Sequence, residues 1–129
     1  MTPTLGQALV VAGGAATGGV LRWLLGLWLN PLWGGFALGT LAVNAAGGLL
    51  VGSIGAWLFV QPSEWLRLLL VTGLLGGFTT FSAFSIESLM LLQRGAFGLA
   101  LLHTAGHLLG SLACAALGWW LVHALLAPR

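Results

Sequence analysis

The sequence predicts an all-α membrane protein with four transmembrane helices, and three observations support this prediction. Of the 129 residues, 59% are hydrophobic and 5% are charged, whereas about a quarter of the residues in a soluble domain are charged. Four apolar segments each exceed the roughly 20 residues that a helix needs to cross the bilayer core. The connections between these segments are short and contain Pro and Gly, which mark turns.

The four apolar segments form one predicted domain over residues 1–129. The predicted helices cover residues 5–29, 36–60, 66–92 and 97–126. An even number of helices places both termini on the same membrane face. Glycine pairs recur at four-residue spacing, a pattern that lets helix backbones approach closely in lipid. These pairs are Gly14/Gly18, Gly35/Gly39, Gly48/Gly52, Gly73/Gly77 and Gly106/Gly110.

The positive charges give no preferred orientation in the membrane. Lys and Arg in short loops normally set orientation, but this chain has no Lys and its arginines divide evenly. Arg22 and Arg94 lie toward one membrane face, and Arg67 and Arg129 lie toward the other. The balance predicts a dual-topology protein, whose two orientations together permit an antiparallel homodimer. A single orientation set by another feature is the alternative.

Residues 73–87 are poor helix material inside the third predicted helix. Three glycines are followed by four hydroxyl residues and three phenylalanines, in a place where lipid requires every backbone group to be satisfied. We therefore expect a break in this helix. Carbonyls freed between Gly76 and Thr79 would be suited to a cation; a simple kink with water on these groups is the alternative.

Polar and aromatic side chains recur at helical spacing and at similar depths in three of the helices. They are Thr40 and Asn44, Phe81 and Phe84, and the stripe His103, His107 and Ser111. If these faces converge, they form a track from mid-membrane to one face. Neutral amides and hydroxyls, with the positive edges of phenyl rings, favour a small anion. Ordinary core packing and interhelical hydrogen bonds are the alternatives.

The ionisable residues at membrane depth allow several interpretations. Arg22 and Glu87 lie at comparable depth, so they form an ion pair, or Arg22 draws anions into a vestibule, or Arg22 extends to the interface. His103 and His107 have the spacing of two metal ligands. Because the sequence places no third ligand near them, a hydrogen-bonded role is favoured over zinc binding.

Three segments carry a family resemblance. Residues 13–22 with their glycine pattern, residues 39–44, and the sequence GGFTTFSAFSIE at residues 76–87 closely resemble the Fluc (CrcB-type) fluoride channels. The resemblance implies passive, selective export of F⁻ across the bacterial inner membrane, which protects the cell from fluoride. It also implies a dual-topology, antiparallel homodimer with two pores.

The resemblance also implies roles for individual residues. Phe81 and Phe84 would line the pore, and Asn44 would supply a pore-facing amide. Further hydroxyls along the pore would come from Thr40, Thr80, Ser82 and Ser111. Carbonyls of Gly76 and Thr79 would hold a structural Na⁺ that is not transported, and Arg22 would belong to the vestibule.

Two residues depart from the family pattern. Ala83 stands where the family commonly has Thr, so one hydroxyl of the pore is missing. His107 lies near a position where Tyr is frequent. Because imidazole titrates near neutrality, this departure predicts a conduction rate that changes with pH.

Other functional classes fit the sequence less well. A small dual-topology multidrug antiporter needs a carboxylate in its first helix, and the first predicted helix has no Asp or Glu. An accessory subunit of a larger membrane complex remains a third possibility. We expect no enzyme, because no nucleophile–base pair is visible, and no nucleic-acid binding, because the chain has no basic cluster.

Overall fold

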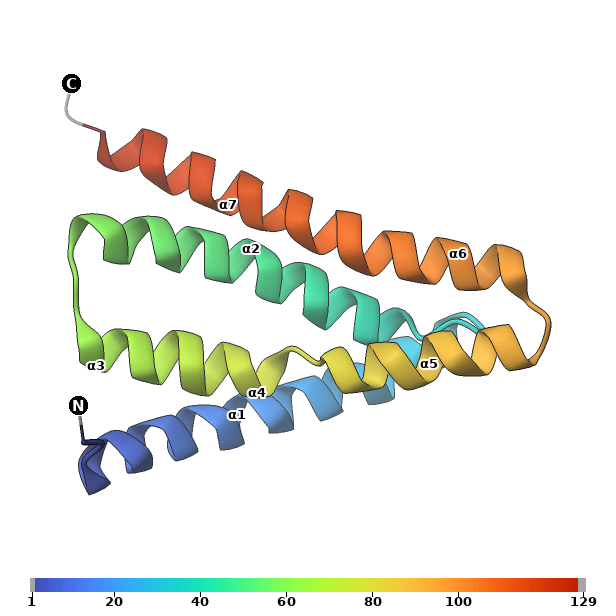
Figure 1. Cartoon of the computed structure of the whole chain (residues 1–129), viewed down its shortest axis with the longest axis horizontal. Helices are drawn as coiled ribbons and strands as arrows, with labels where there is room; N and C mark the ends of the chain where they lie inside the picture. The colour runs from blue at the N-terminus through green and yellow to red at the C-terminus, as the bar shows by residue number, and fades with distance from the viewer. Residues whose placement is uncertain (1, 128–129) are drawn as a thin grey trace.

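The computed structural model describes residues 2–127, which form four long helices lying side by side (Figure 1). Each is long and apolar enough to cross a membrane, as predicted. The four spans are Leu5–Leu32, Leu38–Val60, Glu64–Gln93 and Phe97–Leu126. The first span begins and the last span ends at the same end of the molecule. Arg129, which enters the predicted charge balance, lies outside the described residues.

The first span consists of α1 (Leu5–Leu29) and the short 3₁₀ helix η1 (Asn30–Leu32), and α2 (Leu38–Val60) follows it. Thr4 and Gln7 cap the start of α1 through reciprocal side-chain hydrogen bonds. At the other end, the Asn30 side chain accepts a hydrogen bond of 2.8 Å from the amide of Gly39. This contact ties the turn between the two helices to the first residues of α2, which begins slightly later than predicted.

The third and fourth spans are divided into shorter elements. The third contains α3 (Glu64–Leu66), the π-helix η2 (Arg67–Leu75), α4 (Gly76–Phe78) and α5 (Phe81–Gln93). The fourth contains α6 (Phe97–Ala105), the π-helix η3 (Gly106–Gly110) and α7 (Ser111–Leu126). Thr79 and Thr80, between α4 and α5, have extended backbone with ψ angles of 160° and 118°. The ribbon of Figure 1 shows this interruption between α4 and α5.

Glycines set how closely the helices pack. A Cβ atom on Gly18 in α1 would collide with backbone atoms of Leu74 and Phe78, and one on Gly52 in α2 would collide with the carbonyl of Ala115 in α7. These positions confirm the predicted close approach. The prediction is wrong for Gly35 and Gly110, which have open space around them within this chain: Gly35 lies in a turn, and η3 does not press Gly110 against another helix.

The core of the chain is small. Val43, Leu75 and Phe78 form its buried cluster where α2 meets η2 and α4. Most large hydrophobic side chains along the four spans are exposed instead, among them Leu101 and Leu125. In a membrane protein these side chains contact lipid, so a small core is sufficient. The buried cluster lies directly beside the extended residues Thr79 and Thr80.

Candidate functional site

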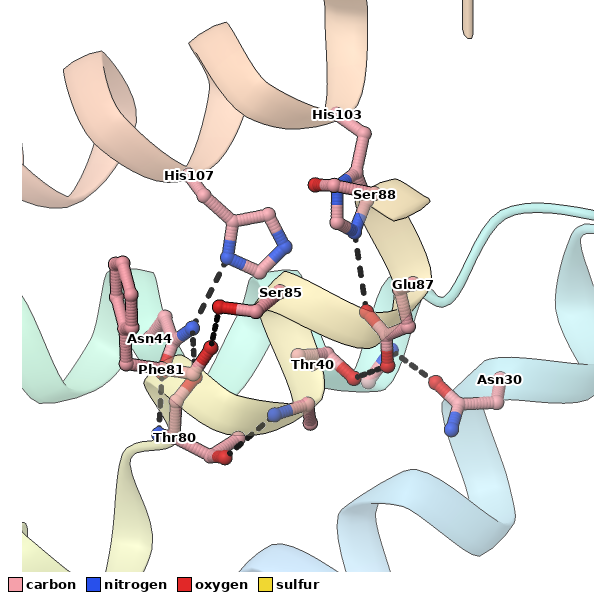
Figure 2. Close-up of polar contacts among 12 residues, drawn as sticks. Asn30, Thr40, Asn44, Thr80, Phe81, Ser85, Glu87, Ser88, His103 and His107 are labelled. Carbon is pink, nitrogen blue, oxygen red and sulfur yellow. Dashed lines mark hydrogen bonds and ion pairs between the residues drawn. The ribbon is translucent and has the colours of Figure 1, made fainter. Parts of the chain in front are cut away.

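Asn44 on α2 binds the extended residue Thr80 through both ends of its side-chain amide. Its Oδ1 accepts a hydrogen bond of 2.8 Å from the amide of Thr80, and its Nδ2 donates one of 2.9 Å to the carbonyl of Thr80. In an unbroken α-helix, the Thr80 amide would donate to the carbonyl of Gly76. The Asn44 side chain therefore replaces a backbone partner at membrane depth (Figure 2).

Two more helical hydrogen bonds are redirected beside Thr80. The Nε of Arg22 donates at 3.0 Å to the carbonyl of Gly77. The amide of Ala83, which would donate to the Thr79 carbonyl in a continuous helix, donates instead to the Thr80 hydroxyl at 3.1 Å. The carbonyls of Gly76 and Thr79 therefore lack the amide donors that a regular helix would supply.

The Asn44 amide also fixes the tautomer of His107. Its Nδ2 lies 3.0 Å from His107 Nδ1. Because both contacts with Thr80 define which end of the amide carries nitrogen, Nδ2 donates here and Nδ1 accepts. The neutral His107 ring therefore carries its hydrogen on Nε2. Among the described residues, neither this Nε2 nor the Ser111 hydroxyl has a hydrogen-bond partner, and both atoms are buried.

These groups share an open groove with the predicted aromatic pair. The Phe81 and Phe84 ring centroids are 5.3 Å apart. Phe84 also packs against His107, whereas Phe81 is 79% exposed. The groove has a volume of about 660 Å³, and the residues lining it include Asn44, Gly76, Thr79, Thr80, Phe81, Phe84, His107 and Ser111. The structure thus places most of the predicted site residues in one depression.

Thr40 and Ser82 are not among the residues that line this groove. Thr40 lies with Arg22 in a separate cavity of about 480 Å³. Ser82 is exposed, and its hydroxyl lies 3.2 Å from that of Thr80. The expected convergence of all the hydroxyl groups on one face therefore does not occur within a single chain. The physical reason is that the Thr40 hydroxyl is hydrogen-bonded to the Glu87 carboxylate, away from the groove.

Thr40 belongs to a second polar cluster around Glu87. The Thr40 hydroxyl donates to one oxygen of the Glu87 carboxylate at 2.5 Å, and His103 Nε2 lies 3.0 Å from the other oxygen. The second ring nitrogen of His103 lies 2.8 Å from the Ser88 hydroxyl. His103 is fully buried. Figure 2 shows this cluster on the side of His107 away from Phe81.

This second cluster corrects two expectations. The Glu87 carboxylate contacts His103, and Arg22 binds a backbone carbonyl, so the ion pair between Arg22 and Glu87, one of the alternatives, is wrong. Glu87 also lies beside His103 and His107, so the structure places near them a third potential metal ligand that the sequence did not reveal. A signal existed: Glu87 and His103 are equally distant from Gly95 in the turn, so antiparallel α5 and α6 bring them together.

Most of the chain is similar in sequence to known proteins. Residues 9–119 match the family described as CrcB-like protein, Camphor Resistance (CrcB). A protein of Aromatoleum aromaticum named fluoride-specific ion channel FluC is 53% identical over 113 residues, which is 86% of each chain. A protein of the same name from Bordetella petrii is 52% identical over 119 residues, 91% of each chain. One from Thiobacillus denitrificans is 46% identical over 87% of this chain and 92% of its own length.

Proposed function

The chain belongs to the CrcB-like family, whose relatives named above are ion channels and not enzymes, and from this premise we propose that it is a fluoride-selective channel. It passively exports F⁻ across the bacterial inner membrane and so lowers the toxicity of fluoride in the cell. The relatives carry the name of a fluoride-specific channel. The chain's four apolar helices provide the membrane setting.

The observation that carries the proposal is the composition of the groove. Asn44, His107 and Ser111 line it with neutral polar side chains, and Phe81 and Phe84 line it with phenyl rings whose edges carry partial positive charge. Fluoride binds its water shell strongly, so a pore must replace that water with other donors. Neutral donors and ring edges achieve this without a fixed charge that would hold the ion too tightly for conduction.

The open groove and the exposed Phe81 support a second copy of the chain as partner. A ring that is 79% exposed on one chain becomes a pore wall when an antiparallel copy covers the groove. The balanced charges permit the opposite insertion that this homodimer needs. A single cysteine introduced by Phe97→Cys in a Cys114→Ala background should react with membrane-impermeant thiol reagents added to either side of the membrane. Labelling from one side alone would contradict dual topology.

A structural Na⁺ belongs to the same proposal. The carbonyls of Gly76 and Thr79 lack their helical donors, because the amides of Thr80 and Ala83 bind side chains. Free carbonyl oxygens are suited to a hard cation such as Na⁺. The ion would hold the interface between the two copies and would not be transported. If exchange of Na⁺ for a large organic cation leaves dimer stability unchanged, this part of the proposal fails.

Fluoride efflux from proteoliposomes, measured with a fluoride electrode, tests the function. The wild-type protein should release fluoride, and Phe81→Ile should lose most of this flux because a ring edge is removed from the pore. Phe97→Ile is the matched control, since Phe97 is also exposed, at 68%, but lies outside the groove. Equal flux in wild type and Phe81→Ile would contradict the pore assignment, and no flux in wild type would favour an accessory subunit.

A further inference from the structure

Glu87, His103 and His107 converge from α5, α6 and η3 on one buried point. One ligand atom from each lies within 4.8 Å of the others. Both histidines are buried, with exposed fractions of 0% and 5%. We propose that these three residues form a binding site for a divalent transition-metal ion of the zinc class. Two histidines and a glutamate are a known ligand set for zinc with a fourth position open to water.

The Glu87–His103 pair is already close to the geometry that a metal ion requires. In a tetrahedral site with bonds of about 2.0–2.1 Å, ligand atoms lie roughly 3.3 Å apart, and Glu87 Oε2 lies 3.0 Å from His103 Nε2. A metal ion would take the place of the proton between these two atoms. The Ser88 hydroxyl, 2.8 Å from His103 Nδ1, would accept the hydrogen of that nitrogen and hold the ring in the ligating tautomer.

His107 supplies the third ligand, and in doing so it loses its hydrogen bond with Asn44. Its Nε2 is buried and has no partner among the described residues, so it is available to a metal ion. In the metal-free protein this atom carries the hydrogen, because Nδ1 accepts from Asn44. Metal binding must move that hydrogen to Nδ1, and the hydrogen bond from Asn44 is then lost. Metal binding therefore competes with the hydrogen bond between the Asn44 amide and His107.

A cavity lies beside the cluster at the end of the bundle that holds the α5–α6 turn. Glu87 and His103 line this cavity of about 280 Å³, together with Arg94 and residues of the turn before α2. His107 lines the large groove on the other side. The site thus lies between two openings. Glu87 is the one carboxylate among the three ligands and the other two are imidazoles, so borderline cations that accept imidazole nitrogen should be preferred over Mg²⁺.

Direct metal binding tests the proposal independently of any fluoride flux. Zn²⁺ binding to the detergent-solubilised protein should be measured by calorimetry, and Co²⁺ binding by its visible absorption spectrum. We expect one ion per chain and no competition from excess Mg²⁺. His103→Gln and His107→Gln should each weaken Zn²⁺ binding more than about tenfold, and Ser88→Ala should weaken it about tenfold.

The matched control is His123→Gln, since His123 is an exposed histidine on α7 outside the cluster. This variant, and Cys114→Ala, should bind Zn²⁺ as tightly as the wild type. His107→Gln keeps the Glu87–His103 pair, so it remains informative if His103→Gln does not fold. The proposal is overturned if Zn²⁺ does not bind the wild type, or if it binds His107→Gln with unchanged affinity.

Discussion

Two polar clusters meet where the His103 and His107 rings contact each other and Phe84, and they differ in charge. The Asn44 cluster (Asn44, Thr80 and His107) borders the groove, and its contacts join amide, backbone and imidazole groups. The Glu87 cluster (Thr40, Glu87, Ser88 and His103) contains a carboxylate and joins residues of α2, α5 and α6. Phe84 joins them: its ring is stacked on His103 with an interplanar angle of 5° and tilted against His107.

The difference indicates how a carboxylate can lie near the proposed anion path without repelling the anion strongly. Both oxygens of the Glu87 carboxylate are bound, one by Thr40 and the other by His103. A compensated carboxylate repels an anion less than a free one does, because its partners offset its field. The groove itself then presents neutral donors. The different roles of the two clusters can be tested by substitutions that disrupt the hydrogen bonds of one cluster at a time.

The largest effect is expected from Asn44→Ala. This change leaves both the amide and the carbonyl of Thr80 without their partner and removes the donor to His107. Each lost hydrogen bond lowers stability by about 0.5–1.5 kcal/mol, so the extended backbone at Thr80 should shift and the groove should change shape. We expect fluoride flux to fall at least about tenfold, which corresponds to a barrier raised by about 1.4 kcal/mol. Unchanged flux in a folded Asn44→Ala protein would mean that the Asn44 cluster does not border the ion path.

A smaller effect on fluoride flux is expected from lowering the pH. This effect tests the Asn44 cluster apart from the Glu87 cluster. Protonation of His107 puts hydrogen on Nδ1, which then faces the Nδ2 of Asn44 and cannot accept from it. Flux should consequently change when the medium is acidified far enough to protonate His107, and His107→Gln should remove most of the change. His103 and Glu87 lie beside this ring and can also take up protons. The pH profile of Glu87→Gln, which keeps His107, is therefore compared with that of His107→Gln. A flat pH profile for the wild type would exclude this role of His107.

The smallest effect is expected from Ser88→Ala in the Glu87 cluster. The change removes one hydrogen bond to His103 and leaves the Glu87–His103 pair in place. Stability should fall by about 0.5–1.5 kcal/mol, as measured by denaturant unfolding in detergent. Flux should stay close to that of the wild type, because Ser88 is not among the residues that line the groove. A flux loss as large as that of Asn44→Ala would remove the distinction between the clusters.

Sequence patterns were sufficient for the features that depend on local spacing. The apolar lengths predict four spans, and the glycine spacing predicts close contacts at Gly18 and Gly52. The contact between Phe81 and Phe84 follows from their i, i+3 positions on one helix. Their roles in conduction and the antiparallel assembly stay predictions, since they depend on a partner and an ion.

Tertiary structure decided which polar groups meet. Asn44 and Thr80 are 36 residues apart, and Glu87 and His103 are 16 apart. Their pairing depends on helix rotation and on where the turns fall, which single-helix periodicity does not report. Composition and spacing determined by themselves that the chain crosses a membrane and which side chains are suited to an anion. Only the packing of helices decided that Arg22 binds a backbone carbonyl while Glu87 takes His103, because an unpaired polar group in lipid must bind whichever partner packing brings within reach.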